Sequence, residues 1–251
     1  MTKKSFILYG KNSVFERLKS NSQSIKKLYL ETDFNTPHIE KLIKSANVRT
    51  ERVSRKVLHK IRPAGPLQGI VAEVEKFEYA DFTELLNKAG SKRLSFIFLD
   101  RVFDPQNLGA IIRTTACFGG FAIVIPKHKA CEVTETVLHV AAGGENFTPV
   151  AMVSNLSNAL IEAKRCGWWI VGAIVTEGQD IGRVNLPFPL GLVLGSEGRG
   201  VRYGIEKHLD VRVQIPMGGA PLSLNINCAC SIFCHQIAKQ RVSSQRIVGK
   251  A

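Results

Sequence analysis

The residue types best suited to chemistry stand in three short segments, one in the middle of the chain and two near its end. In Leu94–Arg113 an apolar run meets an Asp-Pro-x-Asn turn and leads into a predicted helix that carries an arginine. Val193–Gly200 (VLGSEGRG) and Ile215–Asn227 (IPMGGAPLSLNIN) are glycine-bearing turns, and each follows a short apolar run. Because glycine lets backbone amides approach a bound molecule closely, we interpret these turns as candidate ligand loops.

Alternating strands and helices must position these segments. Strands are predicted at 94–100, 121–126, 148–153, 168–175, 190–195 and 211–216, and helices at 106–118, 132–142, 155–166, 200–208 and 222–240. This alternation, with near-continuous apolar runs, is typical of a parallel sheet that is covered on both faces. Ligands of open parallel sheets bind at the carboxyl ends of the strands, which is where both glycine turns are expected.

The first part of the chain is predicted to form a separate small α/β unit. Its helices are expected at 12–19, 36–46 and 55–61, and its strands at 25–30, 48–53 and 69–74. A linker with one short helix should follow, and the chain should end in a short basic tail. The predicted domains are residues 1–75, the linker 76–93, the larger α/β domain 94–241 and the tail 242–251.

Composition limits the class of protein. Apolar content of 45% and charged content of 22% are ordinary for a globular chain of 251 residues. No apolar run reaches the length of a membrane span, and the first apolar stretch is too short for a signal peptide. The six cysteines include no CxxC pair and read as reduced thiols, so a cytoplasmic location is expected.

One cysteine cluster near the end of the chain could suggest a metal site. It comprises Cys228, Cys230, Cys234 and His235. On a helix Cys230 and Cys234 share a face, while Cys228 points elsewhere. Small packing residues are therefore the preferred interpretation, and no metal is expected.

Positive charge is concentrated at the start of the chain. The formal net charge is +13, and residues 1–65 hold 15 Lys and Arg against 5 Asp and Glu. This asymmetry favours a polyanion as partner, most simply nucleic acid, although a solvated basic surface would look the same. The candidate contacts are the basic residues in short polar runs beside strands: Lys26, Lys27, Arg52, Arg55 and Lys56.

Two common nucleotide motifs are missing. The chain has no GxxxxGK[ST] phosphate loop. A dinucleotide-binding GxGxxG should follow the first strand of the sheet, whereas here the glycine turns follow the last two predicted strands. A conventional nicotinamide enzyme and a conventional methyltransferase fold are both disfavoured, because in each the cofactor loop comes early.

Three motifs of the chain together resemble one family. They are Asn107–Arg113 (NLGAIIR), Leu194–Gly198 (LGSEG), and Ile215–Met217 followed by Ser223–Asn225. Their order and spacing are similar to the SpoU (TrmH) group of SPOUT RNA 2′-O-ribose methyltransferases, over about residues 94–241. The amino-terminal unit resembles the small ribosomal-protein-like substrate-binding domain of that group, with Gln68-Gly69-Ile70 as its closing strand.

The resemblance implies a parallel α/β sheet with a carboxyl-terminal trefoil knot that binds S-adenosylmethionine. Its implied cofactor pocket is lined by Leu194, Gly195, Ile215, Met217 and Leu224. Its implied catalytic residues are Arg113, Asn107, Glu197, Ser223 and Asn225. Judged by pattern alone, the apolar residues could equally be core, Glu197 a solvated loop residue, the asparagines and serine helix caps, and Arg113 half of a surface ion pair.

The role of Arg113 stays open between two interpretations. Some accounts of the family make this arginine the base that removes the ribose 2′ proton. A charged guanidinium has no acceptor, however, so its planar fork could instead bind the neighbouring phosphate and lower the pKa of the hydroxyl. Three positions depart from the family pattern: Asn227, where serine is common, Leu222, where a small or polar residue is common, and Leu67, where histidine is common.

The resemblance implies S-adenosylmethionine-dependent methylation of structured RNA, with a guanosine in large-subunit (23S-type) ribosomal RNA as the first expectation. Transfer RNA is the alternative substrate, and a non-catalytic RNA-binding or ribosome-assembly protein is the alternative function. A homodimer is also implied, with the 222–240 helix in its interface. Leu222–Ile237 (LSLNINCACSIFCHQI) is so apolar that burial on several sides is expected.

Overall fold

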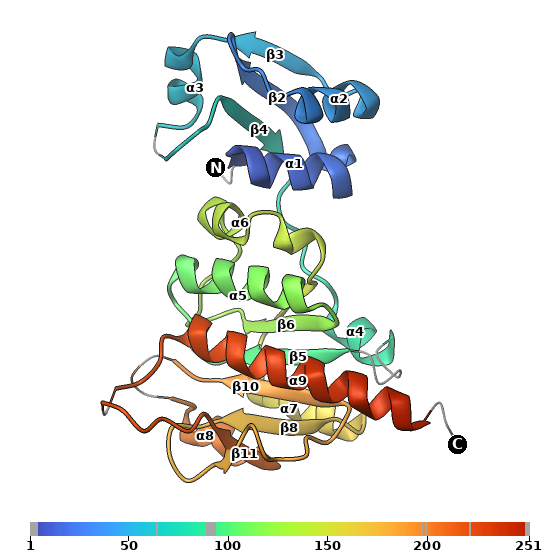
Figure 1. Cartoon of the computed structure of the whole chain (residues 1–251), viewed down its shortest axis with the longest axis vertical. Helices are drawn as coiled ribbons and strands as arrows, with labels where there is room; N and C mark the ends of the chain where they lie inside the picture. Colours follow the sequence, from blue (N-terminus) through green and yellow to red (C-terminus); the bar gives the residue numbers. More distant parts are fainter. Residues whose placement is uncertain are drawn as a thin grey trace.

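A small mixed sheet forms the amino-terminal unit of the computed structural model (Figure 1). The structure describes residues 5–63, 65–88, 94–196, 198, 200–220 and 222–248. Across the small sheet the strands are β1 (Phe6–Tyr9), β4 (Ile70–Val74), β2 (Ile25–Glu31) and β3 (Thr50–Val53). Only β2 and β3 run parallel. Its helices are α1 (Lys11–Ser20), the 3-10 turn η1 (Ser22–Ser24), α2 (Pro37–Ala46) and α3 (Arg55–Ile61).

A seven-stranded sheet, parallel throughout, forms the larger unit. In spatial order its strands are β7 (Val150–Val153), β6 (Phe121–Pro126), β5 (Ser95–Leu99), β10 (Leu190–Leu194), β8 (Trp169–Ala173), β11 (Val211–Gln214) and β9 (Gln179–Asp180). Every residue of β5, β6 and β10 is buried, as expected for central strands with helices on both faces. The parallel α/β class predicted from sequence is therefore confirmed.

Alternation along β5 assigns the helices to the two faces of this sheet. They are α4 (Phe82–Lys88), α5 (Pro105–Phe118), α6 (Glu135–Ala141), the 3-10 turn η2 (Gly144–Asn146), α7 (Leu156–Arg165), α8 (Tyr203–Glu206) and α9 (Ile226–Val248). Ile97 and Leu99 share a core with residues of α5, α6 and α9, whereas Phe96 and Phe98 share one with α4, α7 and α8. Successive side chains of a strand point to opposite faces, so α5 and α9 cover one face and α7 the other.

The last helix differs from the prediction at both ends. It begins at Ile226 rather than at residue 222, because the Asn225 side-chain oxygen accepts the backbone N–H of Asn227 at 2.9 Å and caps it there. It continues to Val248, so most of the predicted tail 242–251 is helical. No glycine or proline interrupts residues 242–248, and nothing local stops the helix before Gly249.

Other differences are smaller. Residues 200–208 hold only the short helix α8, at Tyr203–Glu206. Strands β1 and β9 were not predicted, and both are too short to show a clear periodicity. The remaining elements lie within about three residues of the prediction, the usual error at element boundaries. The trefoil knot and the four domain boundaries stay predictions.

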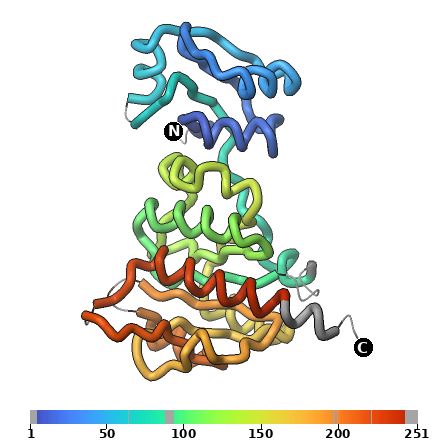
Figure 2. The backbone as a smooth tube through the Cα atoms, viewed as in Figure 1, coloured from blue at the N-terminus to red at the C-terminus, as the bar shows by residue number. Residues whose placement is uncertain are grey.

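Helix α6 lies between the amino-terminal unit and α5, as the backbone trace shows (Figure 2). Gly109 of the NLGAIIR segment permits close packing of α5 on α6, since a Cβ there would lie 2.6 Å from the Val140 Cβ. At the other end of α5, Arg241 of α9 donates to the carbonyl oxygens of Gly119 and Gly120. The helix is thus held at both ends. None of the described helices is long and apolar enough to span a membrane.

Candidate active site

The two glycine turns meet in one cavity of about 990 Å³ at the carboxyl ends of β10 and β11. These strands lie on either side of β8, so their following loops emerge at the same edge of the sheet. The volume is within the range of small-molecule sites. The cavity combines apolar walls with turn backbone, which suits a ligand with a planar apolar part and polar edges.

Gly195 folds the first turn back on itself. A Cβ at this position would lie 2.0 Å from the carbonyl carbon of Gly200, so no side chain fits. The backbone N–H of Gly200 donates to the Ser196 carbonyl at 2.9 Å and closes the turn. The requirement for glycine here is therefore a close approach of two backbone segments, and Gly195, Gly198 and Gly200 all line the cavity.

A buried carboxylate anchors the end of the same turn. Asp100 follows β5 and is fully buried. It accepts from the Arg202 backbone N–H at 3.1 Å and from its Nε at 2.7 Å, with Nη2 at 2.6 Å. The Asp100 N–H in turn donates to the Leu194 carbonyl at 2.8 Å. Asp100 thus fixes both ends of the loop between Leu194 and Arg202, a role that the sequence interpretation missed.

The structure brings together all five residues predicted to hold the cofactor. Leu194, Gly195, Ile215, Met217 and Leu224 all line the cavity. Met217 and Leu224 are exposed in its wall, so for these two the alternative interpretation as core residues is wrong. Ser223 and Leu222 also line it. That these residues bind a cofactor stays a prediction.

Three asparagines join the starts of α5 and α9. The side-chain oxygen of buried Asn107 accepts from the side-chain amides of Asn227, at 2.7 Å, and of Asn225, at 3.3 Å. Asn107 is not the cap of α5, because Asp104 fills that role by accepting the Gln106 N–H at 2.8 Å, with Pro105 in the first turn. A partner for the Asn227 side-chain oxygen is missing among the described residues.

Arg113 lies on α5 six residues beyond Asn107. Six residues of helix turn the side chain by about 120° relative to its starting direction, so the two cannot share a face. Arg113 is exposed, and neither it nor Asn107 is part of the described cavity lining. The structure therefore brings Asn107 and Asn225 together, while Arg113 is exposed and belongs to neither this hydrogen-bonded cluster nor the described cavity lining. Glu197, the remaining predicted catalytic residue, lies outside the described residues.

The structure adds residues that the sequence interpretation did not assign to the site. Asn227 was noted only as a departure from the family pattern, yet it makes the shorter bond to Asn107. Four further polar residues line the cavity: Thr176, Glu177, Glu206 and Arg212. No sequence signal marked these four, because they belong to the loop after β8, to α8 and to β11 rather than to the glycine turns.

The predicted RNA contacts divide into two groups. Lys27 pairs with Glu51 at 2.6 Å, and this hydrogen bond raises the pKa of Lys27 and lowers that of Glu51. Arg52 pairs with Glu40 at 2.9 Å and donates to the carbonyls that follow β2. Arg55 and Lys56 are exposed in the first turn of α3, and Lys26 is exposed on β2. Lys27 and Arg52 are thus each held by a carboxylate of the small unit.

Comparison with known families identifies the class. The model of the SpoU rRNA Methylase family matches residues 95–235, and the model described as RNA 2'-O ribose methyltransferase substrate binding matches residues 7–80. The chain belongs to the SpoU rRNA methylase family. It is an enzyme, an S-adenosylmethionine-dependent RNA 2′-O-ribose methyltransferase, and RNA is its substrate.

Individual relatives align along nearly the whole chain. The Putative TrmH family tRNA/rRNA methyltransferase YacO of Bacillus subtilis is 34% identical over 96% of this chain and 98% of its own length. The 23S rRNA (guanosine-2'-O-)-methyltransferase RlmB of Coxiella burnetii is 35% identical over 93% of this chain and 95% of its own length. Among solved structures, one similar fold is the SpoU methyltransferase AviRb from Streptomyces viridochromogenes in complex with AdoMet. The alignment has a TM-score of 0.80 and 20% identity, and it covers 96% of this chain and 92% of AviRb. This structural likeness shows the fold.

Proposed function

We propose that the protein methylates the ribose 2′-hydroxyl of a guanosine in large-subunit, 23S-type ribosomal RNA, in the cytoplasm. The observation that carries this proposal is the end-to-end similarity to the Coxiella RlmB, which includes the amino-terminal unit. The Aquifex aeolicus TrmH/SpoU tRNA modifying enzyme, by contrast, aligns with only 65% of this chain, at a TM-score of 0.55. Transfer RNA is the second candidate substrate, because YacO is described as acting on tRNA or rRNA.

The cavity fits the cofactor. Apolar side chains of Leu194, Ile215 and Leu224 can enclose an adenine, while backbone amides and carbonyls of Gly195 and the 215–219 turn can bond its edge. When bound, S-adenosylmethionine supplies a methyl group on a sulfonium, which is already a good leaving group. The protein then has mainly to align the ribose oxygen and to activate it.

Arg113 is proposed to act on the ribose and its neighbouring phosphate. A guanidinium fork can hold a phosphate through two N–H donors, and its positive charge lowers the pKa of a nearby hydroxyl. As a base it would first have to lose a proton, and a guanidinium stays protonated in proteins. We therefore favour the phosphate-binding role, while Ser223 and Glu197 orient the hydroxyl.

The asparagine cluster is proposed to hold the catalytic helix in register with the cofactor loops. Asn107 lies in the first turn of α5, and Asn225 ends the second glycine turn. Bonds from Asn225 and Asn227 to one oxygen of Asn107 tie that turn to the helix that carries Arg113. The cluster thereby couples the wall of the cavity to α5.

Residues 1–75 are proposed to be the RNA substrate-binding domain, with 76–93 as linker and 94–241 as the methyltransferase domain. The excess of positive charge in residues 1–65 supports this role, since cations that neutralise phosphates release bound counterions. Arg55 and Lys56 are the strongest contact candidates because they are exposed next to each other in the first turn of α3, and Lys26 is a further exposed candidate on β2. Lys27 and Arg52 are the weaker ones, since each has a carboxylate partner.

A homodimer through α9 is proposed as the active form. One face of α9 is buried in the chain by Ile226, Cys230, Phe233, Cys234 and Ile237. The other face leaves Ile232 37% exposed, and on the neighbouring helix α5 Phe118 is 38% exposed, with its ring 6.2 Å from that of His235. A second copy that covers this surface would explain why the helix is apolar on more than one side.

The test is methyl transfer to defined RNA. Ribosomal and transfer RNA from cells that lack this gene should be incubated separately with the protein and tritiated S-adenosylmethionine. We expect label in large-subunit RNA, at one 2′-O-methyl guanosine found by mapping. Label in transfer RNA alone would contradict the proposed substrate.

A further inference from the structure

One face of α6 and the turn after it carry the contact with the amino-terminal unit. The Glu135 carboxylate accepts the backbone N–H of Ile7 at 2.8 Å. The His139 ring stacks on Tyr9, with centroids 4.0 Å apart. In the turn that follows the helix, Gly143 lies against α1. Glu135 and His139 are four residues apart and share one face of α6, and Gly143 adds a contact beyond the end of the helix, so the three form one stripe that faces the small unit.

Two neighbouring glycines end this stripe and face in different directions. A Cβ on Gly143 would lie 2.3 Å from the Cβ of Glu16 in α1. A Cβ on Gly144 would lie 3.0 Å from the Cα of Arg113 in α5. The backbone of this turn is therefore all that separates helix α1 of the proposed RNA-binding domain from the backbone of the proposed catalytic arginine.

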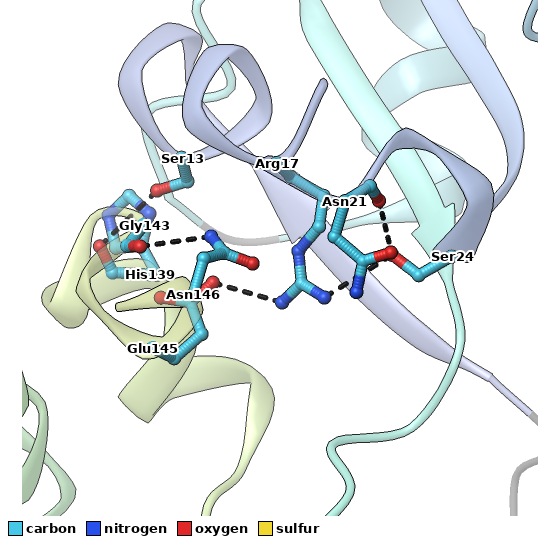
Figure 3. A network of polar contacts seen from close by, with 8 residues as sticks. All are labelled: Ser13, Arg17, Asn21, Ser24, His139, Gly143, Glu145 and Asn146. Carbon is cyan, nitrogen blue, oxygen red and sulfur yellow. Dashed lines mark hydrogen bonds and ion pairs between the residues drawn. The ribbon is translucent and has the colours of Figure 1, made fainter. Parts of the chain in front are cut away.

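A buried ion pair fixes the same turn to the small unit. Arg17 of α1 donates from Nη2 to Glu145 Oε1 at 3.0 Å and from Nη1 to Ser24 Oγ at 3.3 Å (Figure 3). The side chains of Arg17 and Glu145 are 8% and 1% exposed. Asn146 donates to the Gly143 carbonyl at 2.9 Å and closes the turn beside the pair. Burial raises the pKa of Glu145, although Arg17 opposes this effect.

Such a pair is a poor source of net stability. Removing two charges from water costs about as much free energy as their attraction returns. Well-packed apolar side chains in their place usually give a protein of equal or greater stability. What the pair does supply is geometry, because a guanidinium and a carboxylate hold each other at one distance and in few orientations. Its position beside Gly144 makes that geometry relevant to α5.

We propose that Arg17 and Glu145 are positioning residues for methyl transfer, which set the distance between RNA held by residues 1–75 and Arg113. They act through the Gly143–Glu145 turn, which contacts α1 on one side and the Arg113 backbone on the other. This inference rests on the proposed RNA-binding role of residues 1–75. It adds that the small unit is not a freely tethered module: its docking is part of the reaction geometry.

The test compares two variants of the full-length protein, each with one basic residue of α1 replaced by methionine. Arg17→Met removes the buried charge, and Lys19→Met removes an exposed charge two residues away. Dissociation constants for S-adenosylmethionine and RNA are measured together with kcat and KM. We expect kcat of Arg17→Met to fall about tenfold or more at saturating RNA, because small misplacement of reacting groups is costly. S-adenosylmethionine affinity should not change, and Lys19→Met should keep its kcat.

Conservative variants separate positioning from folding. Arg17→Lys keeps the charge but reaches only one partner, and Glu145→Gln keeps an acceptor for Arg17, so both should retain an intermediate kcat. If Arg17→Met fails to fold, these two variants decide by the same readout. A wild-type kcat in all variants that fold, with only the melting temperature lowered, would overturn the proposal.

The RNA used is whichever one the wild-type enzyme methylates. Methylation of transfer RNA instead of ribosomal RNA would change the proposed substrate and leave this comparison intact. A kcat that is insensitive to Arg17 would reject the positioning role and leave the substrate assignment intact.

Discussion

Asn227 donates its side-chain amide to the side-chain oxygen of Asn107 across 2.7 Å and so joins the first turns of α9 and α5. The two residues are 120 positions apart in the chain. The bond fixes the position of the start of each helix relative to the other. Asn227 also departs from the family pattern, in which serine is common at this position. Its orientation requires an acceptor on Asn107 and a donor on Asn227.

Asn227→Asp should therefore destabilise the protein. A charged aspartate only accepts, so it would face the Asn107 oxygen without a proton between them. We expect the free energy of unfolding to fall by about 1–3 kcal/mol, the range for a buried polar group that loses its partner. Urea unfolding measures it, with Asn158→Asp in the exposed first turn of α7 as the matched control. Equal effects of the two changes would contradict the assigned bond.

Arg113→Ala should abolish methyl transfer without loss of fold or cofactor affinity. The side chain is exposed and is not part of the described cavity lining, so its removal should change stability by no more than about 0.5 kcal/mol. Arg113→Lys tests the planar fork, since lysine keeps the charge and loses the two-point geometry. Single-turnover transfer and calorimetric binding of S-adenosylmethionine give both readouts. Substantial activity in Arg113→Ala would remove this residue from the mechanism.

Replacing Arg55 and Lys56 together by glutamine should weaken RNA binding and flatten its salt dependence. Each cation that no longer neutralises a phosphate reduces the slope of log K against log salt by about 1. Lys27→Gln should have less effect, because Glu51 already holds that ammonium at 2.6 Å. Filter binding between low and moderate salt measures the slopes. A larger effect from Lys27 would reverse our ranking of these basic residues.

Stability should depend on pH through Glu145. Burial raises the pKa of this carboxyl above its ordinary value of 4.5, so the folded state keeps a proton that the unfolded state has already lost. Between the pKa of Glu145 in the unfolded state and its higher pKa in the folded state, the free energy of unfolding should fall as pH rises. Above both pKa values, the contribution of Glu145 should stay constant. Glu145→Gln should remove this fall. Urea unfolding from pH 4.5 upward compares the two proteins. If the wild type instead becomes more stable than Glu145→Gln as pH rises, the effect of pairing with Arg17 on the pKa of Glu145 outweighs the effect of burial.

Ile232→Glu should disrupt the proposed dimer. A charge on the outward face of α9 would have to be desolvated in an interface, whereas in a single chain it would remain in water. Light scattering should report twice the 27.7 kDa chain mass for the wild type and the single chain mass for the variant. Lys41→Glu, an exposed change on α2 of the small unit and away from α9, serves as control. A wild type that scatters as a single chain at micromolar concentration would contradict the homodimer.

The central strands could be predicted from sequence because their environment is uniform. Buried parallel strands such as β5, β6 and β10 read as unbroken apolar runs, and the helices between them are long enough to show their own period. The meeting of the two glycine turns also followed from sequence, since parallel strands place their following loops at one edge. The four-residue β1 carries too little pattern, and its partner β4 is about sixty residues away.

Features that depend on distant partners could not be predicted. Residues 222–225 are as compatible with a helix as the residues that follow, and only the Asn225 cap places the start of α9. The role of Asn227 depends on Asn107, and that of Asp100 on Arg202, neither of which is near in sequence. Helical spacing does separate Asn107 from Arg113 by about 120°, but it cannot say which of the two meets the start of α9.

The double contact of α6 limits how this protein can be recombined with its relatives. One side of the helix fits α1 and β1 of the small unit, and the other fits α5. A chimera joined within residues 76–93 would separate Glu145 from Arg17 and Gly143 from Glu16. The part to be exchanged is therefore discontinuous in sequence: residues 135–146 belong with the amino-terminal unit whose shape they match.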